Sequence, residues 1–337
     1  MNRILPRLAV QSRRSLVASA RVVTGAPTTN SSLHHHHRQQ QQVLLQREQF
    51  SSSSDPSVQP YVSGESTHFG FEQVNVQEKE GKVRQVFDNV ADSYDIMNDV
   101  MSAGVHRLWK DYLLEQSQVE VLVKAVRAAQ IDYQILDVAG GTGDVAFRFV
   151  DAANTVERAK SSGADNVKIT VCDINTEMLR VGERRARERF GGAILDESQG
   201  LRFVQGNAQD LRDFEDNTFD LYTIAFGLRN VTDVDLALSE ARRVLKPGGR
   251  FMCLEFSQVP NEVFRQIYDT YSFQIIPWMG QLVANDRASY QYLVESIRKF
   301  SNQEELVQRM TSAGFTEVRY TNLTGGIVAL HEGWKAI

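Results

Sequence analysis

The first 47 residues contain no aspartate or glutamate, although the chain of 337 residues has 42 acidic side chains. The same stretch has seven arginines, many serines and a low-complexity tract, HHHHRQQQQ. An Arg-rich, Ser-rich and acid-free N-terminus is typical of a mitochondrial transit peptide. We therefore predict a mitochondrial transit peptide at residues 1–50. A disordered cytosolic tail, which normally carries some acidic residues, and a plastid targeting segment are the alternatives.

Residues 51–70 are rich in serine, proline and glycine and include the serine run Ser51–Ser54. This composition predicts a disordered linker, so the folded part of the chain is expected to begin near Phe71. The histidine run His34–His37 lies beside a glutamine tract. We interpret it as a homopolymer in an unfolded segment rather than as a set of metal ligands.

Only two cysteines are present, Cys172 and Cys253, and both lie within apolar segments typical of strands. This argues against a disulfide framework and against a cysteine-based zinc site, and we expect no metal. No apolar run approaches the roughly 20 residues that a membrane-spanning helix requires. Without the first 47 residues the chain keeps 30 basic and 42 acidic residues, a net charge of about −12. That sign argues against a nucleic-acid partner, which requires a basic surface.

From Gln134 onward, apolar runs of strand length alternate five times with segments of helical spacing, from QILDVAG to RFMCLEFS. Such an alternation predicts a parallel sheet with helices on both faces. Two further strands, FTEVRYTNL and GGIVALHEG, are predicted near the C-terminus. Thr176 is expected to cap the helix TEMLRVGERRARERF, and the sequence PGG is expected to stop the helix DVDLALSEARRVLK.

Each of the five predicted strands ends in polar residues, which are Asp137, Asp173, Asn207, Arg229 with Asn230, and Glu255. Ligands of parallel sheets bind beyond the carboxyl ends of the strands, so these residues are expected to share one crevice. Residues 262–301 are aromatic and helical in spacing, with predicted breaks at Pro277 and Gly280. This segment is interpreted either as a packed helical pair or as an apolar lid for a hydrophobic substrate.

The glycine-rich stretch ILDVAGGTGD satisfies the spacing of a dinucleotide-binding turn through Gly141, Gly143 and Ala146. A pyrophosphate, however, binds at a helix N-terminus that lacks a competing anion. Here Asp137 precedes the glycines and Asp144 stands at the start of the helix. A carboxylate in the position of Asp137 suits a ligand that carries ammonium and sulfonium charges.

Two further positions favour a cationic nucleoside. Asp173, at the end of the second strand, is placed to accept hydrogen bonds from both ribose hydroxyls, and Asn207 with the Ala208 backbone is placed at the adenine edge. Together these features indicate S-adenosylmethionine, with a tight turn that binds no ligand as the alternative.

Five segments together resemble the ubiquinone/menaquinone-biosynthesis C-methyltransferase family: DVAGGTGD, CDIN-EML, FGLRNV, RVLKPGGRF-CLEFS and SYQYLVESI--F. The resemblance runs from Val83 to Lys335. It implies a class I S-adenosylmethionine-dependent methyltransferase, a Rossmann-like seven-stranded sheet with its last strand antiparallel. The implied domain covers residues 71–337, with an N-terminal helical cover at 71–130 and a helical lid at 262–301. The distance from Thr142 to Asp173 is longer than usual, which we attribute to a surface insertion around ERAKSSGADN.

Matching the family's motifs assigns cofactor contacts to residues of the glycine loop and of the next two strand ends. These are Gly140, Gly141, Thr142, Gly143, Asp173, Asn207 and Ala208, to which our reading of the charges adds Asp137. The implied reaction is methyl transfer to a ring carbon of a polyprenylated methoxy-benzoquinol in ubiquinone biosynthesis. The implied location is the matrix side of the mitochondrial inner membrane. There the enzyme would be peripheral, within a multi-subunit biosynthetic complex, and a homodimer is among the assemblies allowed.

Arg229 and Asn230 are the predicted catalytic residues. A fixed cation at Arg229 would stabilise a developing phenolate, although a pKa above about 12 makes arginine a poor general base. Asn230 would orient a water molecule or a ring hydroxyl. The structural alternative for the pair is a helix cap beside a surface arginine.

Tyr94 and Asp95 are expected to close over the cofactor. His106 is interpreted as structural, with a general base as the alternative role. The alternative functions are a catalytically inactive scaffold subunit of a quinone-biosynthesis complex and an O-methyltransferase.

Overall fold

The computed structural model describes residues 66–90, 98–99, 102–157, 167–195, 200–284 and 287–337. The chain divides into two units, Met1–Ser63 and Gly64–Ile337, and all described residues belong to the second. The predicted transit peptide and most of the predicted linker lie outside the described residues. Tyr94, Asp95 and most of the ERAKSSGADN insertion also lie outside them.

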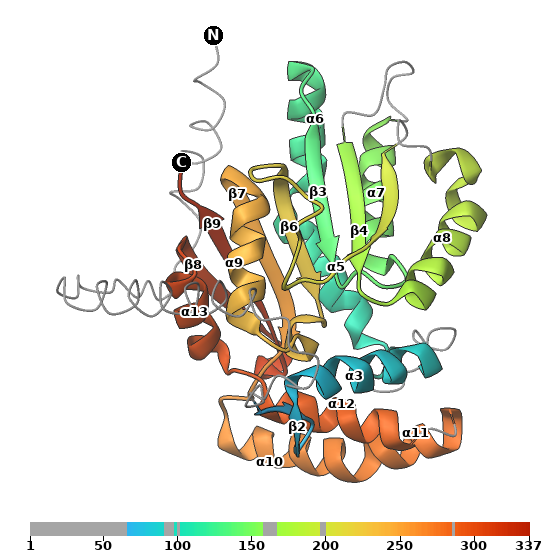
Figure 1. Cartoon of the computed structure of the whole chain (residues 1–337), viewed down its shortest axis with the longest axis vertical. Helices are drawn as coiled ribbons and strands as arrows, with labels where there is room; N and C mark the ends of the chain where they lie inside the picture. Colours follow the sequence, from blue (N-terminus) through green and yellow to red (C-terminus); the bar gives the residue numbers. More distant parts are fainter. Residues whose placement is uncertain (1–65, 91–97, 100–101, 158–166, 196–199, 285–286) are drawn as a thin grey trace, which may run out of the picture. The chain divides into compact units, whose positions relative to one another are not determined.

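Seven strands form one sheet in the order β5-β4-β3-β6-β7-β9-β8, as Figure 1 shows. The strands are β3 (Tyr133–Val138), β4 (Val167–Asp173), β5 (Leu201–Gln205), β6 (Phe219–Ala225), β7 (Leu245–Phe256), β8 (Phe315–Leu323) and β9 (Val328–Lys335). The last strand, β9, runs antiparallel to both of its neighbours, β7 and β8, whereas the other neighbouring strands of this sheet pair in parallel. This confirms the predicted seven-stranded fold class and the two predicted C-terminal strands.

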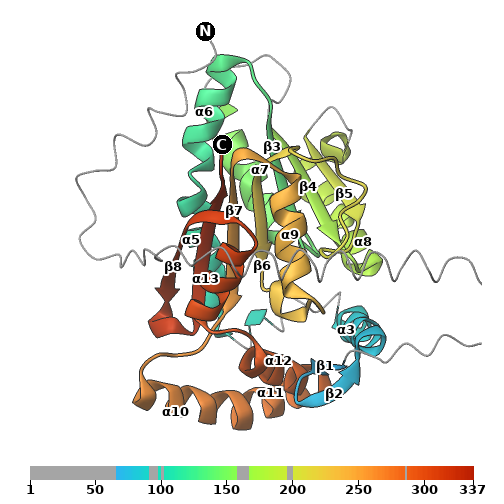
Figure 2. The ribbon, with the colours of Figure 1, turned by 60° about the vertical axis from the view of Figure 1, so that its left-hand side comes forward.

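Helices cover both faces of the sheet (Figure 2). The helices that pack on the sheet are α5 (Val105–Ser117), α6 (Val119–Ala129), α7 (Asp144–Glu157), α8 (Thr176–Phe190), α9 (Val234–Val244) and α13 (Gln303–Ser312). Apolar side chains of α5 to α8 share one core cluster with Ile135, whereas those of α9 and α13 share the other with Leu136. Successive residues of a strand point to opposite faces, so β3 contributes side chains to both core clusters. Cys172 and Cys253 are buried in β4 and β7, as predicted.

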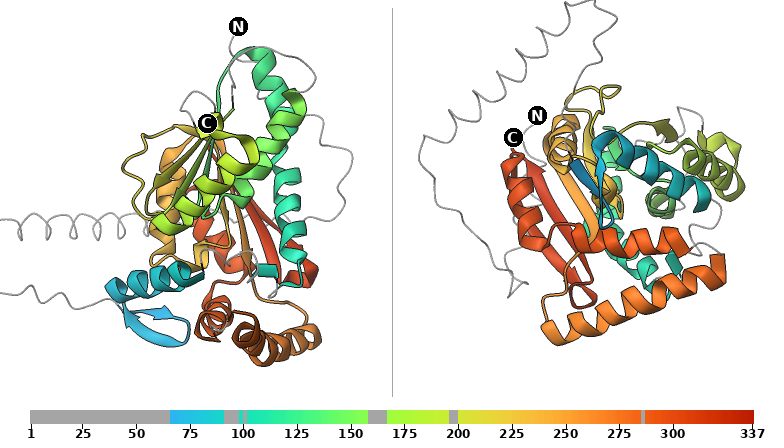
Figure 3. Two further views of the ribbon diagram at one scale, coloured as in Figure 1. Left: turned by 90° about the vertical axis from the view of Figure 1, so that its right-hand side faces the viewer. Right: turned by 60° about the horizontal axis from the view of Figure 1, so that its bottom comes forward.

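A second group of elements lies beyond the carboxyl ends of the parallel strands, as the views in Figure 3 show. These are the hairpin strands β1 (Ser66–Phe69) and β2 (Glu72–Asn75), helices α3 (Val76–Val90), α10 (Glu262–Thr270), α11 (Ile276–Ala284) and α12 (Arg287–Lys299), and the π-helix η5 (Tyr271–Ile275). The predicted linker at residues 51–70 is wrong for its last residues, because β1 pairs with β2 from Ser66 onward. The ring of Phe69 in β1 stacks on Tyr292 of α12 at 4.1 Å between centroids.

The predicted breaks at Pro277 and Gly280 are wrong. The backbone stays helical from α10 through η5 to α11, and Pro277 is the second residue of α11. Proline lacks the N–H that would bond four residues back, and the wide π-turn immediately before it accommodates that loss. Gly280 is required for packing, since a Cβ at this position would overlap the ring of Tyr290 on α12.

Two smaller expectations also change. Asn175, and not Thr176, caps α8, because the Asn175 side chain accepts a hydrogen bond from the Met178 N–H at 3.0 Å. Helix α9 ends at Val244, before the sequence PGG, which lies within β7. No described helix is long and apolar enough to cross a membrane.

Candidate cofactor and substrate site

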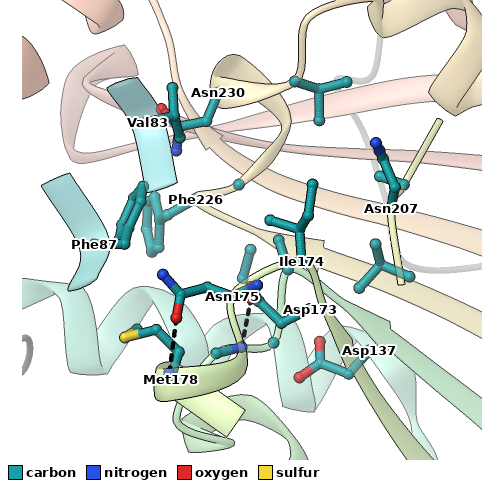
Figure 4. Close-up of a pocket in the computed structure, with 18 of the residues that line it drawn as sticks. Val83, Phe87, Asp137, Asp173, Ile174, Asn175, Met178, Asn207, Phe226 and Asn230 are labelled. Atoms are coloured by element: carbon teal, nitrogen blue, oxygen red, sulfur yellow. Dashed lines mark hydrogen bonds between the residues drawn. The ribbon is translucent and has the colours of Figure 1, made fainter. Parts of the chain in front are cut away.

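A pocket opens at the carboxyl ends of β3 to β6 (Figure 4). The predicted site residues that line it are Asp137, Gly140, Gly141, Thr142, Asp173, Asn207, Ala208 and Asn230. Gly143 and Arg229 are not among the described residues that line this pocket. The five polar strand ends are therefore divided, because Arg229 and Glu255 lie behind the pocket wall.

The glycine loop packs so closely against the sheet and against α7 that two of its positions exclude a side chain. A Cβ on Gly140 would lie 2.7 Å from Val171 Cγ1 and 2.9 Å from the Asp137 carbonyl oxygen. Gly143 has a φ of +83°, a left-handed conformation that favours glycine, and a Cβ there would lie 2.8 Å from the Phe147 ring. Gly143 therefore shapes the turn, while Gly140 brings the backbone against the floor of the pocket.

Asp173 is held by backbone donors on both carboxylate oxygens. Its Oδ2 accepts from the Gly141 N–H at 2.9 Å and its Oδ1 accepts from the Asn175 N–H at 2.8 Å. Burial raises the pKa of Asp173 to about 6, against the lowering effect of these backbone bonds. Each carboxylate oxygen can accept more than one bond, so two hydroxyls of a ribose can still bind.

Asp137 is fully buried and only half satisfied. Thr223 Oγ1 donates to its Oδ1 at 2.7 Å, whereas its Oδ2 has no hydrogen-bond partner among the described residues. Burial raises the pKa of Asp137 to about 7. A buried carboxylate oxygen without a partner is costly, and a cationic ligand group beside the glycine loop would relieve that cost. This buried acceptor oxygen therefore fits the ammonium end of S-adenosylmethionine.

Asp144, the other carboxylate at the glycine loop, is neutralised by the protein itself. Lys110 of α5 donates to its Oδ2 at 2.7 Å, and Arg148 pairs with its Oδ1. Burial acts to raise the pKa of Asp144, but Lys110 and Arg148 outweigh it and lower the pKa to about 2. Asp144 is thus ionised and compensated, so Asp137 and Asp173 remain to bind a cationic nucleoside.

Asn207 and Ala208 line the pocket at the end of β5. The Asn207 Oδ1 accepts from the Gln209 N–H at 3.0 Å, which fixes the turn that follows the strand. Figure 4 shows Asn207 and Asp137 on one side of the pocket and Val83, Phe87 and Phe226 on the other.

The sequence did not predict the residues that form the apolar side of the pocket. Val83 and Phe87 come from α3, and Phe226 follows β6. Helix α3 is held in place by Asn175, whose Nδ2 donates to Asp88 Oδ1 at 2.8 Å. The motif CDIN contains Asn175, but nothing local in the sequence indicates that α3 is its partner.

Asn230 joins the pocket to the helical insertion. Its Oδ1 accepts from the hydroxyl of Tyr292 on α12 at 3.0 Å. Because that oxygen is engaged by Tyr292, the amide nitrogen of Asn230 is available as a donor.

Arg229 points away from the pocket. Its Nη1 donates to Glu255 Oε1 at 2.9 Å and also to the Phe226 carbonyl, and both charged side chains are almost fully buried. The backbone N–H of Arg229 donates to Glu255 Oε2 at 3.2 Å. In this arrangement Arg229 holds the Phe226–Asn230 turn, and its guanidinium does not reach the acceptor side of the pocket.

His106 is buried in α5 and bonded to Ser102 Oγ at 3.0 Å. Burial lowers the pKa of His106 to about 4, so the ring is neutral at pH 7, as a structural histidine would be. Among the described residues, no group of His, Cys, Asp and Glu side chains could hold a metal ion.

Residues 75–335 match the ubiE/COQ5 methyltransferase family. The chain belongs to that family. Relatives from Gallus gallus, Bos taurus and Oryza sativa subsp. japonica are 47%, 49% and 50% identical to it, and the matches span 80–82% of this chain and 83–90% of theirs. All three are named mitochondrial 2-methoxy-6-polyprenyl-1,4-benzoquinol methylase. A solved S-adenosylmethionine-dependent methyltransferase from Thermotoga maritima aligns with 74% of this chain and 99% of its own at 18% identity, with a TM-score of 0.44.

Membership of the ubiE/COQ5 methyltransferase family confirms the predicted resemblance and the predicted class of enzyme, a methyltransferase with S-adenosylmethionine as its methyl donor. The roles of individual residues in this family member rest on the geometry described above.

Proposed function

We propose that this methyltransferase transfers the methyl group of S-adenosylmethionine to a ring carbon of a polyprenylated methoxy-benzoquinol, as a step of ubiquinone biosynthesis. The observation that carries the proposal is the unpaired, buried Oδ2 of Asp137 beside the glycine loop. A pyrophosphate would be repelled there, whereas an ammonium group would be bound. The names of the relatives support the choice of acceptor.

In the proposed binding mode, Asp173 accepts hydrogen bonds from the ribose, Asn207 and Ala208 face the adenine, and Asp137 faces the ammonium group. Gly140, Gly141 and Thr142 contact the ligand along the glycine loop. When bound, S-adenosylmethionine supplies a methyl group on a positively charged sulfur, which an electron-rich ring carbon accepts with loss of one ring proton.

The acceptor ring is proposed to lie against Val83, Phe87 and Phe226. These side chains exclude water and fit an apolar ring that carries a hydrophobic tail. The Asn230 amide nitrogen donates to a ring hydroxyl and stabilises the negative charge that develops on its oxygen. Arg229 holds the turn that positions Asn230, and its positive charge is compensated by the carboxylate of Glu255.

The proposed location is the matrix side of the mitochondrial inner membrane, with peripheral attachment and partners from a multi-subunit biosynthetic complex. Mitochondrial names among the relatives and the acid-free N-terminus support the organelle. Four large apolar side chains on α10, η5 and α11 support membrane contact, because all four are exposed: Val263, Ile267, Ile275 and Trp278. A homodimer is compatible with the same surface.

The experiment combines the full chain, S-adenosylmethionine labelled in its methyl group, and a short-chain methoxy-benzoquinol. Mass spectrometry with fragmentation then locates the label. We expect the label on a ring carbon, with both quinol hydroxyls still free. A label on oxygen would make the protein an O-methyltransferase, and no labelled product from a chain that binds S-adenosylmethionine would favour the scaffold alternative.

A further inference from the structure

A second pocket lies next to the cofactor pocket and shares the segment Val231–Thr232 with it. Four basic side chains line the second pocket, namely Lys79, Arg229, Lys299 and Arg309, and no carboxylate is among its described lining residues. In a chain with more acidic than basic residues, a pocket with only basic charges indicates an anionic ligand.

Two of the four basic groups are already compensated from outside the pocket. Arg229 pairs with Glu255 at 2.9 Å, and Arg309 pairs with Asp235 at 2.7 Å. Lys79 and Lys299 form no ion pair with any described residue, and the Lys299 ammonium lies over the Phe71 ring at 5.8 Å from its centroid. The uncompensated charge of the pocket therefore belongs to these two lysines, one at the start of α3 and one at the end of α12.

Lys79 is the more informative of the two because its side chain is 93% buried, with a relative exposure of 7%. Its Nζ donates to the Val231 carbonyl at 3.0 Å, which uses one of the three donors of an ammonium group. Burial lowers the pKa of Lys79. A buried ammonium without a counter-charge is unfavourable, and an anion in this pocket would provide the missing charge.

Hydroxyl groups complete the lining. Thr232, Ser296 and Ser301 lie around the same pocket as the lysines. The nearby carboxylate of Glu295 is engaged elsewhere, since it accepts from the Phe71 N–H at 3.0 Å and from Gln291 Nε2 at 2.7 Å. The Ser296 hydroxyl donates to the Leu293 carbonyl at 2.9 Å, so the hydroxyls of Thr232 and Ser301 are the ones that can donate to a ligand. Two hydroxyl donors and two ammonium groups suit a tetrahedral oxyanion, which presents several acceptor oxygens.

We propose that this pocket binds a phosphate group between Lys79 and Lys299. The site is separate from the cofactor pocket, and it takes part in no bond-breaking step. Two sources share this chemistry, a soluble phosphate compound and the headgroup of a phospholipid. Because Lys79 belongs to α3 and Lys299 to α12, a bound phosphate would join the two helices that flank Asn230.

The test is a calorimetric titration of the full chain with inorganic phosphate at constant ionic strength. We expect saturable binding that is weakened about tenfold or more by Lys299→Gln, and likewise by Lys79→Gln, because each removes a charge-assisted bond. Lys124→Gln removes an exposed lysine of α6 outside the pocket and should leave the affinity unchanged. Lys299 is exposed, so its replacement leaves the fold intact, as S-adenosylmethionine binding by the same variant will verify.

A second arm distinguishes the source of the phosphate. Vesicles of phosphatidylcholine with phosphatidylglycerol are added to wild type and to Lys299→Gln, with and without free phosphate. Vesicle binding that falls in Lys299→Gln and in free phosphate assigns the site to a lipid headgroup. Saturable phosphate binding with no effect of Lys299→Gln on vesicle binding assigns it to a soluble compound. The proposal is overturned if wild type shows no saturable phosphate binding, or if Lys124→Gln weakens it as much as the pocket variants do.

Discussion

Three aspartates lie around the glycine loop in a single pocket, and the pKa values of their carboxyl groups differ. Asp144 has a pKa of about 2 because two basic groups outweigh its burial, whereas burial raises the pKa of Asp173 to about 6 and that of Asp137 to about 7. The difference follows from the partners and not from the depth of burial alone. Asp137 is therefore the carboxylate whose charge depends most on the ligand.

The replacement Asp137→Asn tests this assignment through stability. The folded-state pKa of Asp137 lies above its unfolded value near 4, so the free energy of unfolding falls as the pH rises from about 4 to about 7. Between pH 5 and pH 8, wild type without ligand should lose on the order of 2–3 kcal/mol that the variant keeps. Urea unfolding at the two pH values measures the difference.

The exposed carboxylate Asp213 provides the control, because Asp213→Asn should follow the wild-type pH profile. At pH 8, saturating S-adenosylmethionine should make wild type more stable than Asp137→Asn, since only wild type offers a negative charge to the ammonium group of the ligand. Parallel pH profiles for wild type and Asp137→Asn would show that Asp137 does not have a raised pKa in the folded protein.

Arg229 and Glu255 form a buried ion pair, so removing one partner leaves the other charge uncompensated. Arg229→Met should lower the free energy of unfolding by about 3–5 kcal/mol, and adding Glu255→Gln should recover part of it. Arg180→Met breaks an exposed pair with Glu177 and should cost less than about 1 kcal/mol. Chemical denaturation of the four proteins measures these values.

Turnover measurements distinguish a role of Arg229 in positioning Asn230 from a purely structural role. Methyl transfer should slow in Arg229→Met while the affinity for S-adenosylmethionine stays near that of wild type, because the guanidinium lies behind Asn230 and not at the cofactor. An equal loss of turnover and cofactor affinity would make Arg229 structural only.

At the scale of elements, the sheet and its glycine loop were predictable because local signals specify them. The β3 segment contains β-branched residues and is followed by the glycine loop, and β8 coincides with the predicted FTEVRYTNL. The helical insertion was harder, because a π-turn ahead of Pro277 keeps the helix continuous and no sequence rule signals it. The site was predictable at the strand ends. Val83 and Phe87 line it, and Tyr292 holds Asn230, through long-range packing that periodicity does not encode.

Gly140→Ala tests how closely the loop approaches the sheet. The new Cβ would lie 2.7 Å from Val171 Cγ1 and 2.9 Å from the Asp137 carbonyl, so the loop must move away from the pocket floor. We expect S-adenosylmethionine affinity to fall by at least about tenfold, because the backbone no longer approaches the ligand. Calorimetric titration of the purified variant gives the affinity.

Gly81→Ala is the matched control for that change. Gly81 lies within α3, and a Cβ there meets nothing within 4 Å. Alanine in a helix interior should raise the free energy of unfolding by about 0.5–1 kcal/mol and leave the affinity unchanged. If Gly140→Ala behaves in the same way, the close approach has no role in binding.

At the scale of the whole molecule, the proposed membrane contact depends on one exposed apolar face. The double replacement Ile267→Ser and Trp278→Ser removes two large side chains from α10 and α11. Sedimentation with phospholipid vesicles should show binding weakened by about tenfold or more, since each buried side chain contributes about 1.5–3 kcal/mol. Val121→Ser, which alters an exposed valine of α6, should have no effect, and equal vesicle binding by all three proteins would refute this surface.

The pocket at the carboxyl ends of β3 to β6 is proposed to bind S-adenosylmethionine through its carboxylates. Calorimetric titration of wild type and Asp173→Ala with S-adenosylmethionine, and of wild type with NAD, tests it most directly. We expect saturable binding by wild type, no binding of NAD, and an affinity at least about 100-fold lower in Asp173→Ala, because two charge-assisted hydrogen bonds are lost. Unchanged affinity in Asp173→Ala, or preferential binding of NAD by wild type, would contradict it.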